Sequence, residues 1–288
     1  MLSLLKNDLR RIIKDQSFIV VFIIGIILSI IGPIFYKVLY VSIDGQKFLD
    51  SIVINENNVG SSIVAVSTAR GQFYGSFAPM SLVNLIISSC IVAIIFKDFG
   101  QGTIRNKIVS GHSRTNILLS IFISSFIVLT TVILINSFLK LLISLILFNY
   151  GMPFDSHEFG YFISSIIFAI LAFAFIASLM VFSCVFAKKS SDALLSYIGN
   201  AILFLILPIL GQLIIDLQIA AKGENAKEIV DFIEFLIKID VINNITDYVG
   251  KSLSYTTSQV LYFTLSAIFL TGLFVLFSWL RLRKKDIK

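Results

Sequence analysis

The run Ile117–Phe148 reads ILLSIFISSFIVLTTVILINSFLKLLISLILF and holds a single charged residue, Lys140. A helix needs about 20 mostly apolar residues to cross the hydrocarbon core of a bilayer. This run exceeds that length, and water-soluble domains do not carry such a stretch on their surface. The run therefore predicts a protein that is built from α-helices and embedded in a membrane.

The composition of the whole chain leads to the same class. Of the 288 residues, 57% are hydrophobic and 14% are charged, and the formal net charge is +6. Soluble domains carry roughly 25% charged residues. The composition excludes a soluble enzyme, a nucleic-acid-binding domain and a disordered chain.

Five other stretches are also apolar and about long enough to cross a bilayer. We expect an all-α integral membrane protein with one transmembrane domain over 1–288, whose six spans lie near residues 18–39, 79–96, 117–148, 162–187, 194–215 and 260–280. Pro and Gly occur inside several of them, which membrane-spanning helices tolerate.

The distribution of basic residues predicts the orientation. Bases outnumber acids in the N-terminal tail, in the loop 97–116, in the turn after the fourth span and in the C-terminal tail. Acids outnumber bases in the loops on the opposite face. Basic residues accumulate on the cytoplasmic side, so we expect a multi-pass plasma-membrane protein with both termini inside the cell.

Two segments outside the spans have helical amphipathic patterns. In residues 1–16, an apolar face is expected from Leu2, Leu5, Leu9, Ile12 and Ile13, and the basic residues are Lys6, Arg10, Arg11 and Lys14. Such a helix can lie at the cytoplasmic interface of the membrane. The second segment, about 226–239 within the outer loop 216–258, is expected either to lie at the outer interface or to cap the bundle.

The loop between the second and third spans, 97–116, reads KDFGQGTIRNKIVSGHSRTN. Gly102 is expected to end the preceding helix and Thr103 to cap the next one. Ile104 and Ile108 then share one face, to which Val109 can be added, while Arg105 and Lys107 point elsewhere. Gly111 is expected to stop this helix. The loop therefore predicts a cationic helix of two turns between two spans.

This segment resembles the cytoplasmic coupling helix of the type-2 ABC exporter permeases. The resemblance rests on an acidic residue, a Gly-Thr pair, a basic residue, an aliphatic position, a small turn residue and a Ser-Arg pair that opens the next span. In this chain these are Asp98, Gly102, Thr103, Arg105, Ile108, Gly111, Ser113 and Arg114. The N-terminal amphipathic helix and the six spans also fit. The outer region differs, because the resembled permeases often have a short re-entrant helical pair where this chain is polar and acidic after Asp216.

The resemblance implies a permease that receives work from a separate ATPase. ATP and Mg would bind the partner, so this chain would hold no cofactor and would not be an enzyme. The implied partners are ABC ATPase subunits, a second copy or a related permease chain, and membrane lipid, with no nucleic acid. The cargo would be amphiphilic or hydrophobic, such as an antimicrobial peptide, a lipid-like molecule or a drug.

In such a permease the short helix would insert its apolar face into a cleft on the ATPase, and Arg105 and Arg114 would pair with acidic groups there. Asn106 and His112 belong to the same expected contact. The alternative is that these basic residues only anchor the loop to lipid phosphates.

Few other residues suggest a catalytic or ligand-binding role. Gly250-Lys251-Ser252 is not a phosphate-binding loop, because position 245 is Ile rather than Gly. The two cysteines and two histidines are scattered, which predicts no metal site. Arg70 is read as an ordinary loop charge and Asp216 as an interfacial acid.

Four polar residues inside spans are candidates for a substrate path: Lys140, Asn136, Asn84 and Asn200. Lys140 is expected near the outer interface, where it either anchors the helix or contacts substrate. Asparagines in spans usually form hydrogen bonds between helices. The other functions considered are a secondary transporter driven by an ion gradient, an intramembrane enzyme, and a membrane sensor or anchor that transports nothing.

Overall fold

The computed structural model describes residues 1–42, 68–78, 81–148, 154, 156–222, 227–242, 244 and 257–284. All regular secondary structure in these residues is helical, which confirms the all-α prediction. Six of the helices are long and apolar enough to cross a membrane. They are α2 (Gln16–Ser42), α6 (Leu82–Gly100), α8 (Arg114–Leu147), α9 (Ser156–Phe186), α10 (Ser190–Lys222) and α13 (Thr257–Lys284).

These helices extend beyond the expected spans because their first or last turns continue into polar residues. Thus α8 begins at Arg114 and α10 continues to Lys222. The expected start of the second span at residue 79 and the segment Gly250-Lys251-Ser252 lie outside the described residues.

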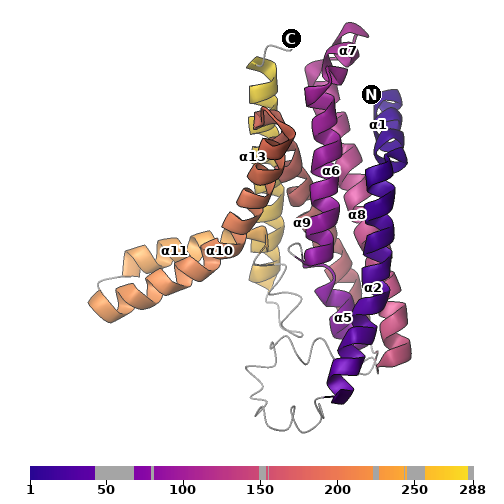
Figure 1. Ribbon diagram of the computed structural model, residues 1–288. Coiled ribbons are helices and arrows are strands. Elements are labelled where there is room, and N and C mark those ends of the chain that lie inside the picture. The colour runs from indigo at the N-terminus through magenta and orange to yellow at the C-terminus, as the bar shows by residue number, and fades with distance from the viewer. Residues whose placement is uncertain are drawn as a thin grey trace.

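Four shorter helices complete the described structure: α1 (Leu2–Lys14), α5 (Ala69–Gly75), α7 (Thr103–Val109) and α11 (Lys227–Ile239). Figure 1 places α1, α7 and the C-terminal turns of α13 at one end of the bundle, which we call the basic end, and α5 toward the opposite end, the far end. The two termini of the described chain therefore lie on the same side of the bundle.

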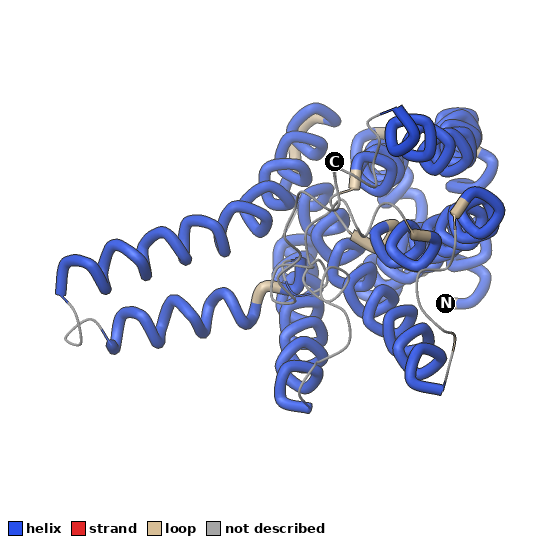
Figure 2. Tube along the Cα trace, turned by 90° about the horizontal axis from the view of Figure 1, so that it is seen from below, coloured by secondary structure: helices blue, strands red, loops and turns tan. Residues whose placement is uncertain are grey.

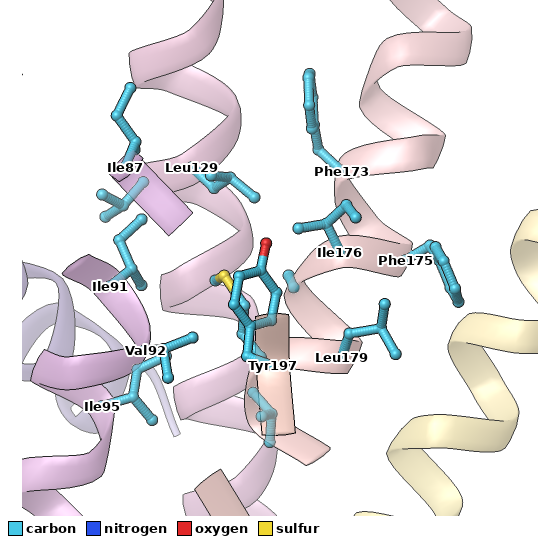
Figure 3. Packing of buried hydrophobic residues seen from close by; sticks show 14 of the residues in the cluster. Ile87, Ile91, Val92, Ile95, Leu129, Phe173, Phe175, Ile176, Leu179 and Tyr197 are labelled. Carbon is cyan, nitrogen blue, oxygen red and sulfur yellow. The ribbon is translucent and has the colours of Figure 1, made fainter. Parts of the chain in front are cut away.

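The core forms around α9, which packs against α6, α8, α10 and α13. Small side chains on α9, among them Ala169, Ala172 and Ala177, are fully buried and let the neighbouring helices approach closely. Tyr197 of α10 enters this core between α6, α8 and α9 (Figure 3), and its hydroxyl donates a hydrogen bond of 2.7 Å to Ser88 of α6. This bond satisfies the one polar group that the buried ring carries.

A pair of helices extends sideways from the bundle. In Figure 1, α10 bends away from the bundle and runs out beside α11, and Figure 2 shows the two helices projecting together. Pro208 lies inside α10 and removes a backbone hydrogen bond, which accounts for a bend. At Gly211 the two helices touch, because a Cβ there would lie 2.9 Å from Ile237. The amphipathic helix predicted near 226–239 exists, and it packs mainly along α10.

Candidate functional site

The short helix α7 is bounded by two glycines in the left-handed backbone region. Gly102 has φ +72° and stands at the N-cap, so the prediction that Thr103 caps the helix is wrong: Thr103 is its first residue. At the other end Gly111 has φ +90°, and its N–H donates to the carbonyl of Ile108 at 2.9 Å. The N–H of His112 donates to the carbonyl of Lys107 at 3.1 Å. These two bonds form a Schellman cap, which confirms Gly111 as the stop.

The next helix begins directly after this cap. The side chain of Ser113 accepts a hydrogen bond of 3.2 Å from the N–H of Asn116 and so caps the N-terminus of α8. The Ser113-Arg114 pair therefore opens the third span, as expected. α7 is fixed at both ends within a few residues of two membrane-spanning helices.

The apolar face of α7 is used by the bundle itself. Ile104 is 2% exposed, and Ile108 packs against the same core. Val109, in contrast, is 80% exposed, and Arg105 and Asn106 are exposed beside it. The expectation that the isoleucine face inserts into a partner is therefore wrong. The surface that α7 offers to a partner consists of Arg105, Asn106 and Val109.

A buried network of charges holds α7 against α1 and α6. The Lys107 ammonium donates to Asp8 of α1 at 2.7 Å and to Asp98 of α6 at 3.2 Å. Asp98 is fully buried and also pairs with Arg11 of α1. The second oxygen of Asp8 accepts a hydrogen bond of 2.6 Å from Ser120 of α8. Ion pairs thereby join α1, α6 and α7 at the basic end, and the hydrogen bond from Ser120 adds α8 to them.

The environment of this network changes the pKa values of its bases. Burial lowers the pKa of Arg11 and of Lys107, and the carboxylate of Asp8 partly opposes this effect at both. At the start of α2, the Lys97 ammonium donates to Asp15 at 2.6 Å and lowers the pKa of that carboxyl group. The network thus brings basic and acidic side chains together at a largely buried site.

The buried face of the N-terminal helix matches the predicted apolar face only in part, since Ile12 is buried and Leu9 packs against the core as expected. Leu4, Asp8 and Ile12 are buried, and α1 packs chiefly on α8. Leu2 and Ile13, which were expected on the apolar face, are exposed. Of the four basic residues, three are exposed and Arg11 is not, because it turns inward to Asp98; the exposed ones are Lys6, Arg10 and Lys14.

Arg114 has a structural role at this end. Its guanidinium donates to the carbonyl oxygens of Leu282 at 3.0 Å and Arg283 at 2.7 Å, in the last turn of α13. The indole N–H of Trp279 donates to Thr115 at 3.0 Å next to it. The hypothesis that Arg114 pairs with a partner's acids does not fit these bonds, because its side chain fastens α13 to α8.

The polar residues inside the spans separate into two groups. Asn84 donates to the carbonyls of Ser76 at 2.8 Å and Ala78 at 2.9 Å, so it holds the turn after α5. Asn200 donates to Ser196, one turn earlier on its own helix. Asn136 and Lys140 instead lie together on the side of α8 that faces α2. The structure therefore does not bring the four candidates into one path.

Arg70 is not the loop charge that we expected. It belongs to α5 and pairs with Glu158 of α9 at 2.8 Å, and Tyr74 donates to the same carboxylate oxygen at 3.0 Å. The guanidinium also lies over the rings of Tyr74 and Tyr161, at 5.3 and 5.0 Å. This ion pair fastens α5 to the bundle at the far end. Asp216 is exposed and accepts a bond from Gln212 on the same helix.

Within the described residues, no three His, Cys, Asp or Glu side chains are grouped as metal ligands. Sequence comparison adds a family assignment to this geometry. The family model described as "ABC-2 family transporter protein" matches residues 2–287, which is nearly the whole chain. None of the curated proteins matches the chain.

Proposed function

The chain belongs to the ABC-2 family of transporter proteins, and we propose that it exports its cargo with energy from an ATPase that docks on α7. Membership of this family makes it the permease, the membrane-spanning subunit of an ABC transporter. The six apolar helices agree with a multi-pass membrane protein. Export, the cargo and the docking of the ATPase are our proposal.

The observation that supports docking on α7 is its combination of rigid attachment and exposure. One side is fixed by the buried Ile104, by the partly buried Ile108 and by Lys107 between two carboxylates. The other side presents Arg105, Asn106 and Val109 to solvent. A helix held in this way moves as a rigid body with α6 and α8, so a push on its outer face reaches two spans directly.

The proposed orientation places the basic end in the cytoplasm. The exposed bases of α1 and those at the C-terminal end of α13 lie there with α7. Because basic residues accumulate on the cytoplasmic side, this end is the one that meets the ATPase, in which ATP and Mg bind. The remaining proposed partner is a second copy or a related permease chain, which we expect because such permeases act in pairs.

For the cargo we propose an amphiphilic or hydrophobic molecule, such as an antimicrobial peptide, a lipid-like molecule or a drug. The support comes from the few charges within the spans. Of those, Glu158 is neutralised by Arg70, so a strongly polar cargo would find few partners along the bundle.

The test uses Arg105→Glu in the tagged chain, purified in mild detergent from cells that hold its ATPase. We expect the ATPase to co-purify with the wild type, and recovery of the ATPase to fall at least about tenfold in the variant, since the charge of a central exposed contact is reversed. ATP hydrolysis by the purified material should fall in parallel.

The matched control is Arg10→Glu, which makes the same charge change on the exposed face of α1. It should retain the ATPase. Equal recovery of the ATPase in wild type and Arg105→Glu, with hydrolysis unchanged, would rule out α7 as the docking element. Loss of the ATPase in both variants would indicate that the ATPase is attracted to the whole basic end and does not make a specific contact with α7.

A further inference from the structure

Two polar side chains of α8 lie one helical turn apart against α2. A Cβ on Gly25 would lie 3.1 Å from the amide nitrogen of Asn136, and a Cβ on Gly32 would lie 3.9 Å from Cε of Lys140. The glycines of α2 therefore leave room for both side chains between the helices. Each polar group lies at a point where α2 carries no side chain of its own.

Within the part of the chain that the structure describes, neither side chain has a hydrogen-bonding or ionic partner. Asn136 is 4% exposed, and neither of its amide atoms has a hydrogen-bond partner among the described residues. Lys140 is half-buried, and within the same residues it forms no ion pair or hydrogen bond. Buried polar groups without partners are costly, and an isolated charge inside a membrane usually marks a functional site.

The position of α2 gives the depth of this pair. Gly32 follows the start of α2 at Gln16 by about 16 residues, or roughly 24 Å at 1.5 Å per residue. The hydrocarbon core is about 30 Å thick. Lys140 therefore lies within the core and close to its far boundary, deeper than a count along α8 alone would place it.

The far end of the same interface carries a second cation. Lys37 of α2 lies over the ring of Phe148, 5.2 Å from its centroid. The side chains of α2 that surround this region are apolar and exposed to the bilayer, among them Ile31, Phe35 and Val38. An anion that reaches Lys140 from outside thus passes Lys37 and has an apolar surface beside it, which suits a lipid with a charged headgroup.

We propose that Lys140 binds an anionic lipid of the leaflet away from the basic end. The Lys140 ammonium donates to the phosphate oxygens. Lys37 attracts the headgroup as it enters, while Asn136 stays covered by α2 one turn deeper. The acyl chains lie against the apolar side of α2. Binding requires neither ATP nor cargo, so it can be tested apart from transport.

The test measures thermal unfolding of the purified full-length chain in a neutral detergent. The additions are phosphatidylglycerol, phosphatidylcholine or inorganic phosphate. We expect phosphatidylglycerol to raise the unfolding temperature by about 3 °C or more, and the other two to have little effect. Lys140→Met should abolish the rise, Lys37→Met should reduce it, and Lys140→Arg should keep it.

The matched control is Lys189→Met, which removes an exposed lysine at the basic end and should leave the rise intact. An equal rise in wild type and Lys140→Met would overturn the proposal. So would an equal effect of phosphatidylcholine on the wild type, while an equal effect of inorganic phosphate would identify a site for free anions instead of lipid. If Lys140→Met does not fold, the comparison of lipids on the wild type and the response of Lys37→Met decide the matter.

Discussion

At the scale of single residues, several charges at the basic end make contacts within the permease itself. Lys107 joins two carboxylates, Arg11 joins one of them, and Arg114 holds the end of α13. Arg105 remains at the surface of α7. A basic residue in a cytoplasmic loop can therefore act as a membrane anchor, a partner contact or an internal fastener. In this protein the internal role accounts for more of them than the sequence suggested.

Lys107→Met tests the buried network. The variant leaves Asp8 and Asp98 with less compensation in a nearly dry site, so we expect the free energy of unfolding to fall by about 3–5 kcal/mol. The measurement is denaturant unfolding in detergent. Lys6→Met, on the exposed side of α1, should change stability by no more than about 0.5 kcal/mol. Similar losses of unfolding free energy in Lys107→Met and Lys6→Met would mean that Lys107 is not the centre of the network.

Asp15 should make the protein sensitive to acid. Its pKa is lowered in the folded state by Lys97, so its contribution to stability is present above the unfolded pKa of about 3.9 and is lost as the pH falls below that value. Unfolding temperatures between pH 3 and pH 6 should therefore fall less steeply in Asp15→Asn. Lys97→Met should flatten the same part of the curve, and a wild-type slope in both variants would contradict this role.

Residue roles were only partly predictable from the sequence. The roles of the turn residues Gly111 and Ser113 were predictable, because they depend on local backbone geometry. The partners of Asp8 and Glu158 were not predictable, because each of them lies far along the chain. Asp8 did give a signal, since it stands four residues from both Leu4 and Ile12 on what is the buried face of α1.

At the scale of helices, the apolar runs predicted the six spans but not the direction in which each helix faces. The membrane exposes apolar side chains as readily as the core buries them, so hydrophobicity does not distinguish the two. For α1 this placed Leu2 and Ile13 on the wrong side. For α7 it suggested a free isoleucine face that the bundle in fact covers.

Gly111→Ala tests whether α7 must be held in one position. The φ of +90° is strained for any residue with a Cβ, so alanine should cost about 1–2 kcal/mol. We expect faster hydrogen exchange in α7 and weaker stimulation of ATP hydrolysis, with little change in total expression. Gly199→Ala, at an open helical position of α10, should be neutral or slightly stabilising. Unchanged exchange in α7 would show that the cap is dispensable.

At the scale of the whole molecule, the number of spans and the common side of the termini were predictable because they follow from length and charge. The sideways pair of α10 and α11 was not predictable (Figure 1). It depends on a bend within α10, and the composition of α10 indicates an uninterrupted span. The structure also gives the bundle two fastened ends, one through the network around Lys107 and one through Arg70 and Glu158.

The central claim is that the ATPase acts on the exposed face of α7, and cysteine cross-linking tests it most directly. With Cys90 and Cys184 replaced by serine or alanine, Val109→Cys provides an exposed thiol at the proposed contact, and Ile13→Cys on α1 provides an exposed control. We predict that a short thiol-to-amine cross-linker joins the ATPase to position 109, that the product changes with added ATP, and that position 13 gives little product. If position 109 gives no product in a complex that still hydrolyses ATP, the ATPase does not act through α7.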